Sequence, residues 1–169
     1  MPTRDYDPSQ GYAFQGDISI VPVPDTIAIA TTDEIAPVAG RLILQEGEVT
    51  GHHHAIRLPQ PVRFRDDGAG AGSGASPRID TADPVLAAAF AAQPKVGTAR
   101  MYRDQRAAEA MVRAGVLTRP DLVVGFLHVQ GGPVTVTHEE HDGIRLPEGR
   151  YAIGRQVESA GAEERMVQD

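Results

Sequence analysis

The sequence predicts a mainly β protein: a small β-barrel or sandwich built from two β halves, with a helical insertion at about residues 80–115. Eighteen Gly and 13 Pro among 169 residues interrupt helices and favour short strands joined by turns. Segments with alternating apolar and polar residues lie before residue 66 and after residue 120. Strands and helices therefore do not alternate along the chain, which argues against a doubly wound α/β fold.

The first β half follows a polar segment, residues 1–15, that we expect to be an extended N-terminal arm. Alternation or short apolar runs predict five strands in this half, over 17–23, 26–29, 41–44, 48–56 and 62–65. Pro59 and Pro61 precede the last of them, so we expect it at a sheet edge.

The central part of the sequence is expected to be an insertion over residues 66–120 that the β fold does not need. It opens with a Gly-rich loop at 66–78, which contains no large apolar side chain to bury. Two helices are expected, over 85–92 and 103–114, because both stretches are rich in strong helix formers. Gly115 stands where glycines commonly end helices.

The second β half is expected to contain three strands, over 122–129, 134–138 and 149–156. Gly131 and Gly132 predict a tight hairpin between the first two. We therefore expect a single β domain over 16–157, followed by a polar tail over 158–169 with weak helical character.

Histidines are concentrated at two places in the β halves. Three are consecutive, His52 to His54, and two more, His138 and His141, flank a pair of glutamates. Side chains alternate faces along a strand, so His52 and His54 can chelate one metal ion while His53 points away. A tight site needs three or four ligands, so we expect His138 and His141 to complete it.

The expected ion is divalent, zinc or iron, and Glu139 or Glu140 would act as general base through a metal-bound water, as in a metal-dependent hydrolase or oxygenase. The spacing of His138 and His141 differs from the i, i+4 zinc signature of a helix and places them on opposite faces of a regular strand. A purely structural interpretation stays open, with the histidine run as a polar surface stretch and the glutamates in a charged turn.

Several short motifs of this sequence resemble those of an uncharacterised family of small microbial and phage-type β-proteins. They are Gly16-Asp17, Gly-Glu-Val-Thr-Gly-His-x-His at 47–54, His-x-x-His at 138–141, Leu-Pro-x-Gly-x-Tyr at 146–151, and Gln156. The resemblance implies a β fold and the histidine clusters, names no reaction, and leaves 66–120 unmatched. The His pair after Gly51 also resembles the first cupin motif, but the expected glutamate is absent and Ala55 follows.

Composition excludes several function classes. The chain has no Cys, so it has no disulfide or thiolate metal site, and its net charge of −7 argues against nucleic-acid binding. No apolar run suggests a membrane span or a signal peptide, so we expect a cytoplasmic protein, or a virion-associated one if it is phage-encoded. The alternative to a metal-binding protein is a non-catalytic component of a virion or other large complex, with a protein partner or as a homo-oligomer.

Overall fold

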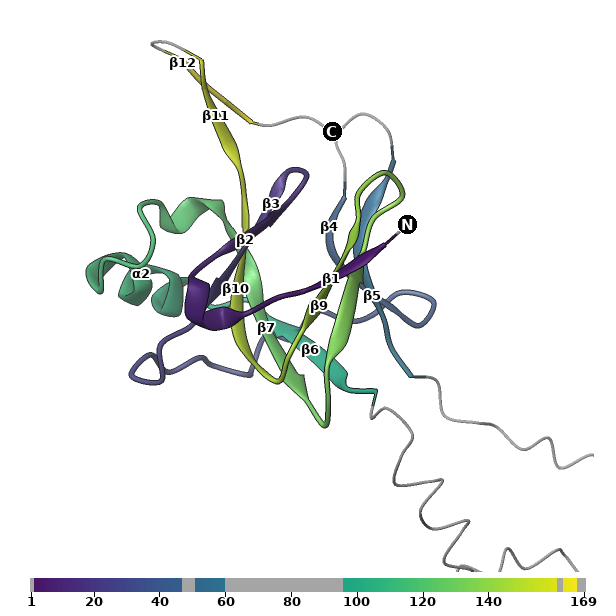
Figure 1. Cartoon of the computed structure of the whole chain (residues 1–169). Coiled ribbons are helices and arrows are strands. Elements are labelled where there is room, and N and C mark those ends of the chain that lie inside the picture. Colours follow the sequence, from purple (N-terminus) through teal and green to yellow (C-terminus); the bar gives the residue numbers. More distant parts are fainter. Residues whose placement is uncertain (1, 47–50, 60–95, 161–162, 167–169) are drawn as a thin grey trace, which may run out of the picture. The chain divides into compact units, whose positions relative to one another are not determined.

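The computed structural model describes residues 2–46, 51–59, 96–160 and 163–166. Ten of its strands form two five-stranded sheets (Figure 1), with the orders β1-β9-β8-β5-β4 and β2-β3-β10-β7-β6. The prediction of a mainly β fold is confirmed. The sheets do not close into a barrel, so the sandwich is the one of the two expected architectures that fits.

The first sheet, sheet A, mixes one parallel pair with antiparallel pairs. Its edge strand β1 runs parallel to β9 and its other strands are antiparallel. The strands in spatial order are β1 (Thr3–Asp5), β9 (Gly143–Leu146), β8 (Val134–Thr137), β5 (His53–Arg57) and β4 (Arg41–Glu46). The segment expected as an N-terminal arm thus contributes a strand to this sheet.

The second sheet, sheet B, is antiparallel throughout. Its strands in spatial order are β2 (Ala13–Gln15), β3 (Ile18–Pro22), β10 (Gly149–Arg155), β7 (Val123–Gln130) and β6 (Thr98–Tyr102). Two short 3₁₀ helices, η1 (Pro8–Gln10) and η2 (Pro120–Leu122), precede β2 and β7. Near the C-terminus β11 (Val157–Ala160) and β12 (Glu163–Met166) form a separate hairpin, where weak helix was expected.

Apolar side chains from both sheets make one core. The largest fully buried members come from alternate positions of the strands, as the two-residue period requires: Ile18, Ile20, Leu42, Leu44, Ile56, Met101, Leu127, Ile144, Leu146 and Tyr151. A second, smaller cluster joins Phe126 and Ala152 of sheet B to α2 (Gln105–Arg113). Sheet B is therefore covered by the helix on one face and by the core on the other.

Helix α2 ends before Gly115, as the sequence predicts, and begins two residues later than expected, at Gln105. The Asp104 side chain accepts a hydrogen bond from Ala107 N, which is an N-cap, and Gly115 takes a φ of +72° just past the last turn. Its apolar side, with Ala107 and Met111, is buried in the second cluster. Of the helices described, none is long and apolar enough to cross a membrane.

Two local predictions were wrong. Gly131 and Gly132, with φ of +76° and +141°, join β7 of sheet B to β8 of sheet A, so they make a corner between the sheets and not a hairpin. A Cβ on Gly97 would lie 1.9 Å from Gly132 O, so the corner is packed closely against the chain before β6. The stretch 26–29 forms no strand, and its Ile27 is buried in the cluster under α2.

Residues 96–120, which were expected within the insertion, belong to the same compact unit as the two sheets. They include β6 and α2, and Met101 and Met111 are both fully buried. The strand expected at 62–65, the Gly-rich loop and the helix at 85–92 lie outside the described residues. The strand expected over 48–56 begins at His53 as β5, with 47–50 outside the described residues.

Candidate functional site

A two-residue turn between β2 and β3 places a carboxylate between the sheets. Gln15 pairs with Ile18, so Gly16 and Asp17 form the loop, and Gly16 has a φ of +54°. A positive φ at the first loop position is typical of a type II′ turn, where glycine is favoured. The Asp17 side chain is buried and turns toward sheet A.

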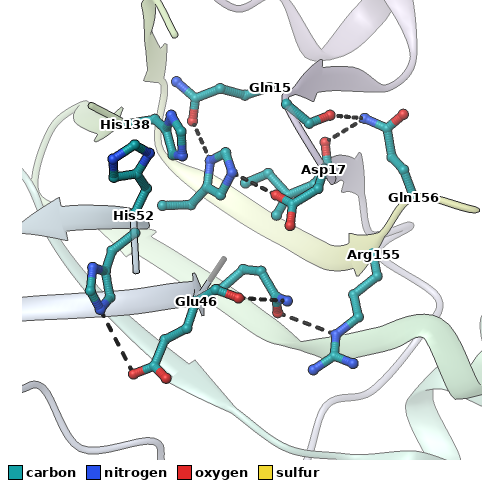
Figure 2. Close-up of polar contacts among 12 residues, drawn as sticks. Gln15, Asp17, Glu46, His52, His138, Arg155 and Gln156 are labelled. Atoms are coloured by element: carbon teal, nitrogen blue, oxygen red, sulfur yellow. Dashed lines mark hydrogen bonds and ion pairs between the residues drawn. The ribbon is translucent and has the colours of Figure 1, made fainter. Parts of the chain in front are cut away.

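Gln156 holds this turn from the end of β10. Its backbone N–H donates to Asp17 O at 2.8 Å, and its side-chain amide donates to Gly16 O at 2.8 Å and to Ile18 O at 3.0 Å. Figure 2 shows the two side-chain contacts beside Asp17. Three hydrogen bonds from one residue fix the position of the turn, and therefore that of the Asp17 carboxylate.

His54, the second residue of β5, makes the most deeply buried polar contact of the protein's described part. Its Nε2 lies 2.7 Å from Asp17 Oδ1, and the two side chains are 1% and 7% exposed. Its Nδ1 lies 3.1 Å from Oε1 of Gln15. Strand β2 of sheet B and the turn that follows it thus meet β5 of sheet A through this imidazole.

The orientation of the Gln15 amide decides what His54 can do. The Gln15 amide nitrogen donates to Asp142 O at 2.6 Å and to Val136 O at 3.4 Å, so its Oε1 is the atom that faces His54. Both ring nitrogens of His54 therefore face acceptors, an arrangement that suits an imidazolium beside a carboxylate. In this arrangement neither nitrogen offers a lone pair to a metal.

Three of the other histidines, His52, His138 and His141, form a chain of ring contacts with His54. His138 stacks on His54 with ring centroids 4.2 Å apart, and on His141 at 4.6 Å. His52 meets His138 edge-on at 5.7 Å, and His54 lies 6.3 Å from His141. The structure thus brings together all four residues predicted as ligands, from β5, from the residue before it and from the loop after β8. We call Gln15, Asp17 and His54 the inner half of this cluster, and His52, Glu140 and His141 the outer half.

The two glutamates of the loop differ in their contacts. Glu139 Oε2 accepts a hydrogen bond from His53 N at 3.0 Å, and this bond lowers the pKa of Glu139. Glu140 Oε2 lies 3.6 Å from His52 Nδ1. Glu139 therefore ties the loop to β5, whereas Glu140 is the carboxylate that faces an imidazole of the cluster.

His53 lies on the opposite side of β5 from His54, as the alternation predicts. Its Nε2 is 3.9 Å from Oε1 of Glu46 on the neighbouring strand β4 (Figure 2). The sixth histidine, His128, lies on β7 against Tyr102, with ring centroids 5.0 Å apart. Burial lowers the pKa of His128, and the nearby charge of Arg150 lowers it further.

Among the residues that the structure describes, no three His, Asp or Glu side chains are arranged to hold a metal ion. The lone pair of an imidazole lies in the ring plane, and the stacked planes of His54 and His138 are only 25° apart. In addition, Nδ1 of His138 accepts a hydrogen bond from Glu140 N at 3.1 Å, which directs the ring proton to Nε2.

The Leu-Pro-x-Gly-x-Tyr motif has a structural explanation. Tyr151 Oη donates to Pro147 O at 2.9 Å, which closes the turn between β9 and β10. A Cβ on Gly149 would lie 3.1 Å from that hydroxyl, so the turn has little room for a side chain there. Burial raises the pKa of Tyr151 to about 12.

Sequence reasoning missed Gln15 and Asp17 as members of the cluster. The sequence marks Gly16-Asp17 and Gln156 only as motif positions of the family that it resembles, and assigns no contact to them. Their partners are distant in the sequence, and hydrophobic periodicity says nothing about which polar residues meet across two sheets. The one usable signal was a carboxylate directly after a glycine at a strand boundary.

A family model for a domain of unknown function, DUF8820, matches residues 14–82 and 96–156. The chain belongs to this family. Searches of curated proteins and of solved structures return no match. The match contains every residue of the histidine cluster and ends at Gln156, while β1 and the β11–β12 hairpin lie outside it. It agrees with the expected membership of an uncharacterised family.

Proposed function

We propose that this protein binds a divalent metal ion, zinc or iron, through His52, His138, His141 and Glu140. The observation that carries the proposal is the spacing of the imidazoles. His52 and His141 lie 5.7 Å and 4.6 Å from His138, measured between ring centroids. Two imidazoles on one tetrahedral ion have centroids about 5 Å apart, since the metal–nitrogen bonds are about 2.0–2.1 Å long.

Binding requires side-chain rotation at His138 and the loss of its hydrogen bond from Glu140 N. One such bond contributes about 1 kcal/mol, whereas structural zinc sites bind with about 10–16 kcal/mol. The ion can therefore outweigh this loss. His54 is left out of the donor set, because freeing it would also leave Asp17 buried without its counter-charge, at about 3–5 kcal/mol.

Glu140 is the carboxylate placed to serve beside such an ion, as a fourth ligand or as general base in a metal-dependent hydrolase or oxygenase. Glu139 is not proposed for this role, because its Oε2 already accepts the hydrogen bond from His53 N. The sequence offers both glutamates as catalytic residues, and the proposal keeps only Glu140.

The test is metal analysis of the untagged protein, followed by calorimetric titration with zinc, iron(II) and manganese(II). We expect one bound ion per chain, and His138→Ala to weaken binding by more than the about 10–100-fold typical of residues around the ligands. His53→Ala is the matched control, one residue from His54 and on the other side of β5. Equal affinities of the parent and both variants, or no binding at all, would contradict the proposal.

The second candidate is a non-catalytic component of a virion or other large assembly, acting through a protein partner. It is favoured by two exposed aromatic side chains at the N-terminal end, Tyr12 and Phe14, which are 63% and 46% exposed. Large apolar side chains grouped at a surface are typical of interaction sites.

A further inference from the structure

The N-terminal strands β1 and β2 are the outermost strands of the two different sheets, and each has one neighbour among the described strands. The short helix η1 connects them, since β1 comes directly before it in the chain and β2 directly after it (Figure 1). The opposite edge of sheet B is different, because Ile35 N donates to Met101 O and Arg103 N donates to Asp33 O, which covers β6. The edge of sheet B at β2 has no such cover in the part of the chain described.

The register of β2 shows which backbone groups point outward. Gln15 and Ile18 flank the two-residue turn and bond to each other, and such pairs alternate with pairs that point away. Phe14, in the next pair, therefore directs its N–H and C=O away from β3. Its carbonyl accepts a hydrogen bond from the Arg4 guanidinium, and its N–H points to the same side of the strand.

The same reasoning applies to β1. Tyr6 N donates to Arg145 O and Gly143 N donates to Pro2 O, so the even-numbered residues face β9. The backbone groups of Thr3 and Asp5 therefore face the open side. Of the residues whose backbone groups face outward, Asp5 of β1 and Phe14 of β2 line one groove.

Side chains, and not backbone hydrogen bonds, connect β1 to β2 within the described residues. Near η1 the Tyr6 hydroxyl donates to Gly11 O, and further out Arg4 reaches Phe14 O. Between them lies a groove of about 400 Å³, whose apolar lining includes Tyr6, Tyr12, Phe14 and Ile144. Strands that pair directly are about 4.7–4.9 Å apart. Because β1 and β2 are connected here by the length of an arginine side chain, they are further apart than a directly paired set, and a third strand has room between them.

The charges at the groove select the kind of occupant. Asp5 and Asp7 line it. Asp5 is 81% exposed and its Oδ1 lies 3.4 Å from the guanidinium of Arg145, a residue outside the lining, and the hydrogen bond from the Ser9 hydroxyl lowers the pKa of Asp7. The guanidinium of Arg4, the one basic residue in the lining, is engaged with Phe14 O. A second copy of a chain with net charge −7 would add like charge here.

We propose that the groove between β1 and β2 binds an extended basic peptide segment of another protein, which pairs with the outer edge of β2. A peptide carbonyl accepts from Phe14 N, apolar side chains lie against Tyr12 and Phe14, and basic side chains face Asp5 and Asp7. This is strand addition, in which main-chain hydrogen bonds supply affinity and side-chain contacts supply specificity. The site is separate from the histidine cluster, and it gives the second candidate function a defined surface.

The probe for the test is a synthetic eight-residue peptide of alternating Arg and Val, compared with its Glu–Val counterpart by fluorescence anisotropy on the full chain. We expect the Arg peptide to bind and the Glu peptide to bind about tenfold more weakly or not at all. In amide NMR spectra the Arg peptide should shift Thr3, Asp5 and Phe14. Lack of binding, equal binding of the two peptides, or shifts mapped elsewhere would overturn the proposal.

Two matched pairs of variants locate the site. Phe14→Pro removes the outward N–H and should weaken the Arg peptide about tenfold, whereas Phe14→Leu keeps that N–H and should change affinity less. Asp5→Asn with Asp7→Asn should weaken binding, and Asp121→Asn, an exposed acid outside the groove, should not. Light scattering that shows a dimer through β2 would overturn the proposal in favour of a second copy. The metal affinity of Phe14→Pro should equal that of the parent, so the metal-binding proposal and the peptide-binding proposal can fail independently of each other.

Discussion

The inner and outer halves of the histidine cluster contain similar residue types in opposite environments. In the inner half, His54 and Asp17 are buried and their polar atoms face one another or Gln15. In the outer half, Glu140 is exposed and His141 is half-buried. A fully buried ion pair serves the fold, while a half-open set of donors can exchange partners with a ligand. Adjacent histidines in one sequence motif therefore need not share a role.

The largest expected effect is on stability, at the inner half. His54→Ala leaves the Asp17 carboxylate buried without a counter-charge and should lower the free energy of unfolding by about 3–5 kcal/mol. Urea denaturation measures it. His53→Ala, which removes an exposed contact with Glu46, should cost less than about 1 kcal/mol. Similar losses for the two variants would mean that the inner half is not the structural part of the cluster.

The next effect concerns the turn that positions Asp17. Gln156→Ala removes two side-chain hydrogen bonds, to Gly16 O and Ile18 O, and should lower the free energy of unfolding by about 1–3 kcal/mol. Gln10→Ala, an exposed glutamine at η1, is the control and should change it by less than about 0.5 kcal/mol. If both glutamines behave alike in urea denaturation, the turn does not depend on Gln156.

At the outer half we expect binding and stability to separate. Glu140→Gln and His141→Ala should each lower the free energy of unfolding by less than about 1 kcal/mol, because their contacts are partly solvated. Both should weaken metal binding in the calorimetric titration. A large loss of stability with unchanged metal affinity, in either variant, would reverse the roles of the two halves.

The smallest effect is a pH dependence at the loop that connects the halves. The hydrogen bond from His53 N lowers the pKa of Glu139 below its unfolded value, so its contribution to stability is present above about pH 4.5 and is lost as the pH falls through the folded pKa. Glu139→Gln should therefore lose less stability than the parent on acidification from about pH 5 to pH 3. Parallel urea midpoints for the two proteins across this range would exclude the contribution.

Much of the fold could be predicted from local patterns. The strands at 17–23, 41–44 and 149–156 and the helix at 103–114 appear in the structure, with boundaries shifted by a few residues. Each has a strong period or a recognisable cap. The short stretch 26–29 did not form a strand, because an apolar run of that length fits equally well as a buried loop under α2.

Patterns could not assign strands to sheets. Gly131-Gly132 is a reasonable hairpin signal by local turn chemistry, but β7 and β8 join different sheets, and the glycines supply the positive φ values of a corner. Residues 96–120 looked separable because they hold a helix, yet Met101 and Met111 are core residues. Only the packed structure shows which apolar side chains a helix or strand shares with its neighbours.

For the cluster, the sequence by itself determined the clustering of histidines and the opposite orientation of His53, since both follow from spacing and the two-residue period of a strand. The tertiary structure alone decided that Asp17 and Gln15 take both nitrogens of His54, and that Glu139 and Glu140 differ. Those contacts join residues far apart in the chain, and their energies depend on burial and on which atoms face one another. Neither quantity is encoded in local spacing.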